Sequence, residues 1–264
     1  MQASEPTRRM PVLFVGHGSP MNALEGNEFR RGWEETAARL PKPKAVVCVS
    51  AHWETPGVSI TTADRPETIH DFYGFPHKLF EVRYPAPGDP ELARRAADLM
   101  KEEPVRLDGS RGLDHGCWSV LRGMYPDADV PTVQISLDTS RPGRFHYALA
   151  RELAPLREQG VLIVGSGDIV HNLGIMDWRK IDGYDWAQRF NDEVKKRIAA
   201  REHQGLVDYE TLGPEARLAI PTPEHYLPLL YALGLQERDE PIAFFNDQTV
   251  MGSVSMTCLS IGAA

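Results

Sequence analysis

Short apolar runs rich in β-branched residues alternate along this chain with longer stretches that have helical periodicity. We expect strands at 12–16, 45–50, 58–63, 132–137, 161–166, 242–246 and 253–261, and helices near 27–40, 89–102, 114–124, 143–158, 184–203 and 225–233. This alternation is typical of a parallel sheet whose strands are connected by helices packed on its faces. The sequence therefore predicts an α/β protein, a three-layer α/β/α fold with a mostly parallel, mixed central sheet.

No linker, repeat or low-complexity stretch interrupts this pattern. A length of 264 residues is long for one domain but within the range of a single α/β unit. We expect one catalytic domain over residues 1–264, with residues 1–10 as a flexible N-terminal tail. Residues 64–88 are rich in aromatic residues, proline and histidine, and a connection of this length is usually functional.

The net charge and the apolar content of the chain limit the kinds of partner that it can bind. The formal net charge is -8, and lysine and arginine are scattered along the chain, so we expect no nucleic acid or anionic membrane as partner. No segment approaches the roughly 18–20 apolar residues of a membrane span, and the first ten residues lack the apolar core of a signal peptide. We expect a cytoplasmic protein, a monomer or a small homo-oligomer. Cys48, Cys117 and Cys258 stand far apart in apolar contexts, which predicts buried, reduced thiols.

Three histidines follow three of the predicted strands. His17 follows "VLFVG", His52 follows "AVVCVSA", and His171 follows "VLIVGSGDIV". The carboxyl ends of parallel strands share one edge of a sheet, where ligands bind. Neutral imidazole is a common ligand for zinc and also suits iron. These histidines therefore indicate a metal site assembled from separate strand ends.

Other residues compete for a place in this site. His225, in "TPEHYLPLL", is a fourth candidate ligand at or just before a helix start, where the helix dipole favours neutral imidazole. Glu224 beside it is the carboxylate alternative, because non-haem iron sites commonly use two histidines and one carboxylate. His115 opens a predicted helix, a position suited to an anionic substrate. Ser19 and Ser166 lie in no nucleophile elbow, and we expect them to shape turns.

Six segments in the same order resemble the class III, LigB-type extradiol ring-cleaving dioxygenases, specifically the DOPA 4,5-dioxygenase branch. They are "GHGSP" (16–20), "SAHW" (50–53), "HDFYGFP" (70–76), "LDHGCW" (113–118), "GSGDIVHN" (165–172) and "TPEHYLPLL" (222–230). The resemblance implies a metal-dependent enzyme that inserts both atoms of O₂ into a catechol ring, DOPA or a related compound, with meta cleavage to a semialdehyde. It also implies one metal ion, natively Fe(II), with Zn(II) as an alternative occupant.

The resemblance assigns roles to individual residues. His17, His52 and His225 would be metal ligands. His171 would be a further ligand or the acid/base, and His171 is our candidate for the base because imidazole titrates near the working pH. His115 would stand beside the substrate as a second catalytic histidine.

Trp53 follows His52, and Phe72 and Tyr73 lie in the long loop at 64–88. We expect Tyr73, Phe72 and Trp53 to pack against the substrate ring.

Three histidines and a water molecule also describe a zinc hydrolase, which would turn over without oxygen. A tetrapyrrole chelatase shares the "GHGS" segment but not the "SAHW" and "TPEHY" segments. A non-enzymatic metal-binding protein on the same scaffold would turn over no catechol.

Overall fold

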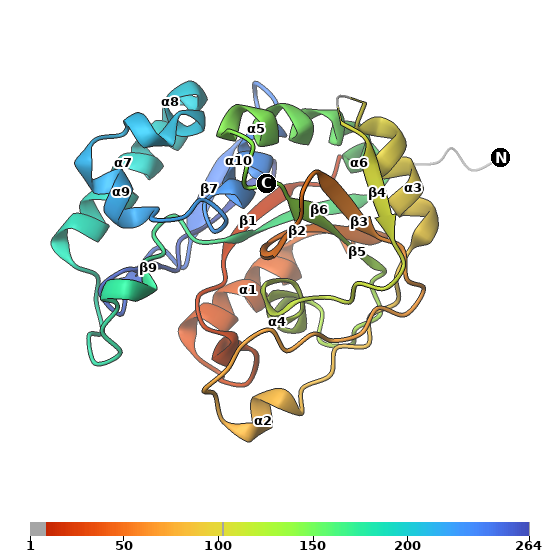
Figure 1. Cartoon of the computed structure of the whole chain (residues 1–264), viewed down its shortest axis with the longest axis horizontal. Helices are drawn as coiled ribbons and strands as arrows, with labels where there is room; N and C mark the ends of the chain where they lie inside the picture. Colours follow the sequence, from red (N-terminus) through yellow and green to blue (C-terminus); the bar gives the residue numbers. More distant parts are fainter. Residues whose placement is uncertain (1–8, 102, 264) are drawn as a thin grey trace.

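The computed structural model describes residues 9–101 and 103–263, and its centre is an eight-stranded mixed sheet (Figure 1). The strand order is β4-β3-β5-β2-β6-β1-β10-β7. The four central strands run parallel, and they are β5 (Thr132–Leu137), β2 (Ala45–Glu54), β6 (Val161–Gly167) and β1 (Val12–Gly16). The outer strands are β3 (Val58–Thr61), β4 (Val105–Asp108), β10 (Cys258–Ile261) and β7 (Ile242–Phe245). β3 pairs antiparallel with β5, and β10 pairs antiparallel with both β1 and β7.

Two layers of helices cover this sheet, one on each face (Figure 1). Successive side chains of β1 point to opposite faces. Val12 and Phe14 join an apolar cluster with helices α3, α5, α6, α7 and α10, whereas Leu13 and Val15 join a second cluster with α1 and α4. The bounds are α1 (Glu28–Arg39), α3 (Pro90–Leu99), α4 (His115–Met124), α5 (Gly143–Glu152), α6 (Ala154–Glu158), α7 (Asp185–Ala199) and α10 (Leu227–Gly234). The expectation of a three-layer α/β/α fold with a mixed, mostly parallel sheet is therefore confirmed.

Shorter elements complete the described chain. They are η1 (Pro20–Ala23), α2 (His77–Phe80), η2 (Leu173–Ile175), α8 (His203–Val207), η3 (Tyr209–Thr211), α9 (Pro214–Ala219), β8 (Thr249–Val250) and β9 (Val254–Ser255). Helix α2 lies within the long loop predicted over residues 64–88. In Figure 1 it lies at the lower margin of the molecule, away from the sheet.

The structure divides or extends several predicted elements. The helix expected at 143–158 is interrupted at Leu153, because Pro155 begins a new helix and cannot donate a backbone hydrogen bond. The strand expected at 253–261 is two strands, β9 and β10, and the strand expected at 45–50 continues to Glu54. β4 was not predicted, because two exposed residues between two half-buried ones replace the continuous apolar pattern at this edge of the sheet.

The N-terminal tail was expected to include Met10. Instead Met10 is buried, and its backbone N–H donates to Arg157 O at 3.0 Å, because the chain enters β1 immediately afterwards. Residues 1–8 of the expected tail lie outside the described residues.

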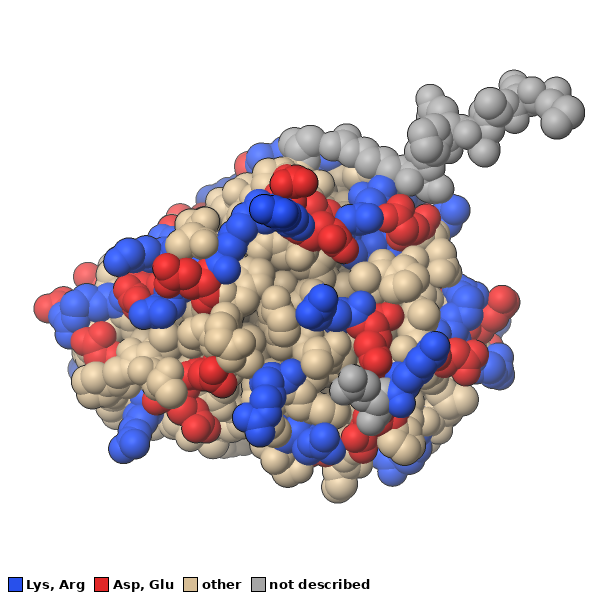
Figure 2. All heavy atoms as spheres, turned by 90° about the horizontal axis from the view of Figure 1, so that it is seen from above, with Lys and Arg blue, Asp and Glu red and all other residues tan. Residues whose placement is uncertain are grey.

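The three cysteines are buried and free, as predicted. Within the described part of the chain, no helix has the length and apolar character needed to cross a membrane. Figure 2 shows acidic and basic side chains interspersed over one face.

Candidate active site

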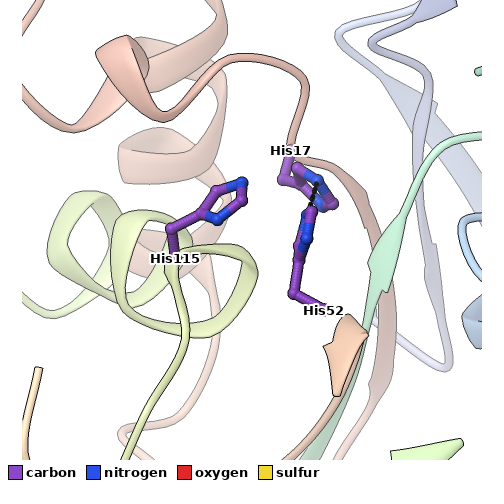
Figure 3. Close-up of side chains that lie close together, drawn as sticks. All are labelled: His17, His52 and His115. Carbon is purple, nitrogen blue, oxygen red and sulfur yellow. Dashed lines mark hydrogen bonds between the residues drawn. The ribbon is translucent and has the colours of Figure 1, made fainter. Parts of the chain in front are cut away.

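Three histidine side chains converge at the carboxyl ends of the central strands. His17 follows β1, His52 lies near the carboxyl end of β2, and His225 lies just before α10. The ring centroids are 5.0 Å apart for His17 and His52, 5.3 Å for His17 and His225, and 4.9 Å for His52 and His225. The Nε2 atoms of His17 and His52 are 3.0 Å apart (Figure 3). The structure thus brings together the rings of three of the four histidines that were candidate ligands. One ligand atom from each of His17, His52 and His115 also lies within 4.8 Å of the others.

Ser166 determines which nitrogen of His17 is free to bind a metal. The Ser166 hydroxyl donates its hydrogen to Gly116 O at 2.6 Å. It must therefore accept from His17 Nδ1, which lies 3.1 Å away. With the proton on Nδ1, His17 Nε2 presents a lone pair to the cluster. Ser166 was expected only to shape a turn, and this expectation is corrected because its hydroxyl orients a candidate ligand.

Glu224 plays the same part for His225. His225 Nδ1 is 3.1 Å from Glu224 Oε1, a carboxylate oxygen that can only accept. His225 Nε2 is buried and has no hydrogen-bond partner among residues 9–101 and 103–263. A buried ring nitrogen that lies among other imidazoles and has no hydrogen-bond partner is the kind of ligand atom that a cation requires. In the same region, Gly167 lets the chain of His225 approach β6 closely, because a Cβ there would lie 2.1 Å from His225 O.

Burial sets the charge of these rings. It lowers the pKa of His17 well below its ordinary value, and the charges of neighbouring histidines lower it further. The pKa of His52 and that of His225 are lowered in the same way, first by burial. A metal ligand must be a neutral imidazole. The donor set of three neutral histidines therefore fits a divalent cation.

His171 lies against His225. The two rings are stacked, with centroids 3.4 Å apart and planes inclined by 10°. Its backbone is fixed on both sides, because His171 N donates to Ala219 O at 2.9 Å and the residue bridges to Val254 in a short antiparallel contact. Burial lowers the pKa of His171 to about 4, which differs from the ordinary imidazole value assumed from sequence. The ring is therefore neutral near pH 7, and the expectation that it titrates near the working pH is not met.

His115 lies at the N-terminus of α4 and faces His17 and His52 (Figure 3). Its ring centroid is 3.8 Å from that of His52 and 5.7 Å from that of His17. Asp114 caps α4 by accepting from Cys117 N at 3.1 Å, and its carboxylate is held by Ser50 and Gln134. The buried cap therefore fixes the start of the helix and the direction of His115.

Asp71, from the loop at 64–88, faces two of the histidines. Its Oδ1 accepts from the backbone N and the Nδ1 of His115, and its Oδ2 is 3.7 Å from His52 Nδ1. Burial raises the pKa of Asp71, but the hydrogen bond from His115 and the nearby imidazoles outweigh burial and lower the pKa to about 2. The sequence interpretation assigned Asp71 no role. Its position in "HDFYGFP" was a signal, because a carboxylate beside histidines often orients them.

Asp168 was also missed. It follows β6 directly and is 1% exposed. Its Oδ2 is 3.7 Å from His17 Nε2, and one ligand atom from each of His17, Asp168 and His225 lies within 4.8 Å of the others. Burial raises the pKa of the Asp168 carboxyl well above its ordinary value. Its place immediately after an apolar strand was the available signal.

The aromatic residues expected to line the site differ in their placement. Phe72 packs edge-on against His115, with ring centroids 5.6 Å apart. Trp53 follows His52 in β2, so the alternation of the strand directs its side chain to the other face, where Arg111 lies 5.5 Å from the ring. Tyr73 is 92% exposed, because the loop bends at Gly74 and leaves the ring in solvent. The structure therefore brings only Phe72 of these three against the histidines.

Comparisons with known proteins agree with this geometry. The family model described as the catalytic LigB subunit of aromatic ring-opening dioxygenase matches residues 11–257. The chain belongs to the LigB family. Within it, the chain is 48% identical over 260 residues to a 4,5-DOPA dioxygenase extradiol from Escherichia coli (strain K12), covering 96% of this chain and 95% of that protein. It is 40% identical over 230 residues to a protein of the same name from Beta vulgaris, covering 84% and 85%.

A solved structure shows the same fold. The crystal structure of an uncharacterized protein from Escherichia coli K12 superposes with a TM-score of 0.84 at 44% sequence identity, over 96% of this chain and 100% of that chain. As a LigB-family member, the protein is a metal-dependent extradiol dioxygenase that opens a catechol ring with O₂. This finding favours the dioxygenase over the hydrolase, chelatase and non-enzymatic alternatives.

Proposed function

We propose that the enzyme cleaves DOPA or a closely related catechol next to its hydroxyl groups and produces a semialdehyde. His17, His52 and His225 hold Fe(II), and Zn(II) is able to occupy the same ligands. His171 is the base, and His115 stands beside the substrate as the second catalytic histidine. Relatives that are 48% and 40% identical are named 4,5-DOPA dioxygenase extradiol, which supports this choice of substrate.

The convergence of His17, His52 and His225 is the observation that carries this proposal. Ser166 and Glu224 accept hydrogen bonds from the Nδ1–H groups of His17 and His225, so both rings turn a bare Nε2 into the cluster. Since His17 Nε2 has no proton, the 3.0 Å contact to His52 Nε2 is a hydrogen bond whose proton His52 supplies. A divalent cation takes the place of that proton.

The proton transfers follow from the positions of His171 and His115. His171 is neutral and stacked on His225, so its free nitrogen can take a proton from a catechol hydroxyl beside the metal ligands. His115 donates its Nδ1 proton to Asp71, so its Nε2 is the atom left to exchange a proton with the substrate. Phe72 packs against His115 and gives the substrate ring an apolar wall. When bound, Fe(II) supplies the electron transfer between catechol and O₂ that organic side chains cannot provide.

Reconstitution tests this function. Protein freed of metal and reloaded anaerobically with Fe(II) is mixed with DOPA, caffeate, catechol and protocatechuate in air, while O₂ uptake and the absorbance of the yellow semialdehyde are followed. We expect one O₂ consumed for each ring opened, and DOPA to have the highest kcat/KM of the four. Intact catechols at full iron occupancy would refute the assignment.

Variants separate the roles of the histidines. His17→Ala should lose the metal, whereas His171→Ala should keep most of the metal and lose turnover. His77→Ala, at the exposed first residue of α2, where the imidazole faces Glu81, is the matched control and should change neither. Equal loss of metal from the His17 and His171 variants would show that His171 is a ligand and not the base.

We further propose that residues 1–264 act as one catalytic domain, that the protein is cytoplasmic, and that it is a monomer or a small homo-oligomer. The three free, buried thiols support a reducing compartment. Sedimentation equilibrium of the purified protein measures the oligomeric state. A large assembly would contradict this part of the proposal.

A further inference from the structure

Asp168 is a buried carboxylate beside the proposed metal ligands, and the function proposed above gives it no role. We propose that its Oδ2 is a fourth protein ligand of the metal, so that the centre consists of three histidines and one carboxylate. This inference rests on the metal site of the proposed function. It assigns to Asp168 the negative charge that the three-histidine set lacks.

The contacts of Asp168 aim one oxygen at the cluster. Its Oδ1 accepts from Gly18 N at 3.2 Å, and its backbone N donates to His225 O at 2.8 Å. Gly18 adopts φ +54°, which turns its N–H toward the carboxylate directly after His17. Asp168 is therefore tied to the segments that carry both His17 and His225.

The other oxygen is left for a cation. Asp168 Oδ2 is buried and accepts no hydrogen bond from any residue that the structure describes. Burying a carboxylate oxygen without a partner is costly, and a metal ion removes that cost. His225 Nε2 is unpartnered in the same way, and both atoms belong to residues whose ligand atoms lie within 4.8 Å of one another and of His17.

The distances fit ligands that share one ion. Two ligand atoms about 2.1 Å from a metal and roughly 90–109° apart are separated by about 3.0–3.4 Å. His17 Nε2 is 3.0 Å from His52 Nε2 and 3.7 Å from Asp168 Oδ2. A contraction of a few tenths of an ångström on metal binding brings the carboxylate to bonding distance.

Glu224 is the competing carboxylate, with a ligand atom within 4.8 Å of His171 and His225, and its Oε1 is already engaged. Glu224 Oε1 accepts from His225 Nδ1 at 3.1 Å and from Thr222 Oγ1 at 2.9 Å. Glu224 therefore acts on the metal through His225, whereas Asp168 faces it directly. One carboxylate ligand gives Fe(II) the charge that it has in two-histidine, one-carboxylate sites.

The test compares the wild-type protein with Asp168→Asn, which keeps the shape of the side chain and an acceptor for Gly18 N. Both proteins are freed of metal and titrated with Zn²⁺ against a competing chelator, and with Co²⁺ while its visible absorption is recorded. Loss of an outer partner of a ligand costs roughly 10–100-fold in metal affinity. We expect Asp168→Asn to lose more than this and to change the Co²⁺ absorption bands.

Two further variants complete the test. Asp138 follows β5 as Asp168 follows β6, and its buried carboxylate accepts from Gly57 N and Ser140 Oγ. Asp138→Asn is the matched control and should bind Zn²⁺ and Co²⁺ as the wild type does. Glu224→Gln should weaken binding but keep the Co²⁺ bands, because it removes an orienting group.

The possible results distinguish a failure of the Asp168 assignment from a failure of the proposed function. A wild-type protein that binds neither Zn²⁺ nor Co²⁺ would overturn the metal centre as a whole. A wild-type protein that binds both, with Co²⁺ bands unchanged in Asp168→Asn whatever its affinity, would overturn only the assignment of Asp168. Altered bands in Glu224→Gln and not in Asp168→Asn would do the same and make Glu224 the carboxylate ligand.

Discussion

Asp71 accepts two hydrogen bonds from His115 on a single carboxylate oxygen, each 3.0 Å long, one from the backbone N and one from the ring Nδ1. The first holds the start of α4, and the second fixes the orientation and tautomer of the ring. The loop at 64–88 is thereby joined to both the backbone and the ring of His115, the proposed second catalytic histidine. Asp71 acts through His115 and is a positioning residue.

We expect Asp71→Asn to lower kcat by about 10–100-fold, because a neutral amide oxygen is a weaker acceptor than a carboxylate and holds the ring of His115 less firmly. The metal content should stay near that of the wild type, since Asp71 Oδ2 is 3.7 Å from His52 Nδ1, which is beyond hydrogen-bond distance. Steady-state kinetics and metal analysis on the same preparation measure both. Asp64→Asn, at an exposed position of the same loop, is the control. A variant with normal kcat would show that the orientation of His115 does not depend on Asp71.

Ser166 provides a second prediction, about metal affinity. Its hydroxyl links Gly116 O and His17 Nδ1, so Ser166→Ala frees the ring of His17 to adopt the other tautomer. We expect the affinity for Zn²⁺ to fall by roughly 10–100-fold. Ser119 is equally buried but has no hydrogen-bond partner among the described residues, so Ser119→Ala is the matched control and should bind as the wild type does. Equal affinities in the two variants would contradict the tautomer argument.

The sequence indicated the histidines of the candidate site more completely than the residues around them. His17, His52 and His171 were recognisable because each follows an apolar strand, and parallel strand ends meet at one edge. Ser166 and Asp71 were not, because their roles depend on which atoms face each other across chain separations of 149 and 44 residues. The pattern of residue types along the chain contains no information on those contacts.

The fold shows the same division. The central strands were predicted because both faces are buried and their apolar runs are unbroken, as in Val161–Gly167. The edge strand Val105–Asp108 was missed because its side chains are partly exposed. The break between α5 and α6 was readable from Pro155, whose ring is incompatible with the interior of a helix. The central strands are thus identified by their local pattern, whereas this edge strand forms through its pairing with β3.

Gly167 provides a third prediction. A Cβ at this position would lie 2.1 Å from His225 O, and a backbone atom cannot move aside as a flexible side chain can. Gly167→Ala should therefore displace the segment of His225, lower Zn²⁺ affinity, and lower the free energy of unfolding by about 1–3 kcal/mol. Gly26→Ala is the control, because nothing lies within 4 Å of a Cβ built there. Chelator competition and denaturant unfolding measure the two effects. Unchanged affinity in Gly167→Ala would contradict the close packing of β6 against His225.

His146, which is not a proposed metal ligand, provides a prediction about how the free energy of unfolding depends on pH. Its ring is fully buried in α5, where Nε2 lies 3.0 Å from Asp138 O and Nδ1 lies 3.3 Å from the Tyr231 hydroxyl. Burial lowers the pKa of His146 to about 4, from an ordinary value of 6.5, despite the hydrogen bond to Asp138. The unfolded chain therefore binds this proton more tightly than the folded protein.

It follows that stability due to neutral His146 is fully present above pH 6.5 and is lost as pH falls from 6.5 toward 4. Between pH 8 and pH 5 the loss amounts to about 2 kcal/mol of unfolding free energy. His146→Gln cannot bind the proton, so its unfolding free energy should fall by about 2 kcal/mol less than that of the wild type over this range. Urea unfolding of both metal-free proteins at each pH gives the difference. Parallel pH profiles would show that His146 does not contribute to acid destabilisation.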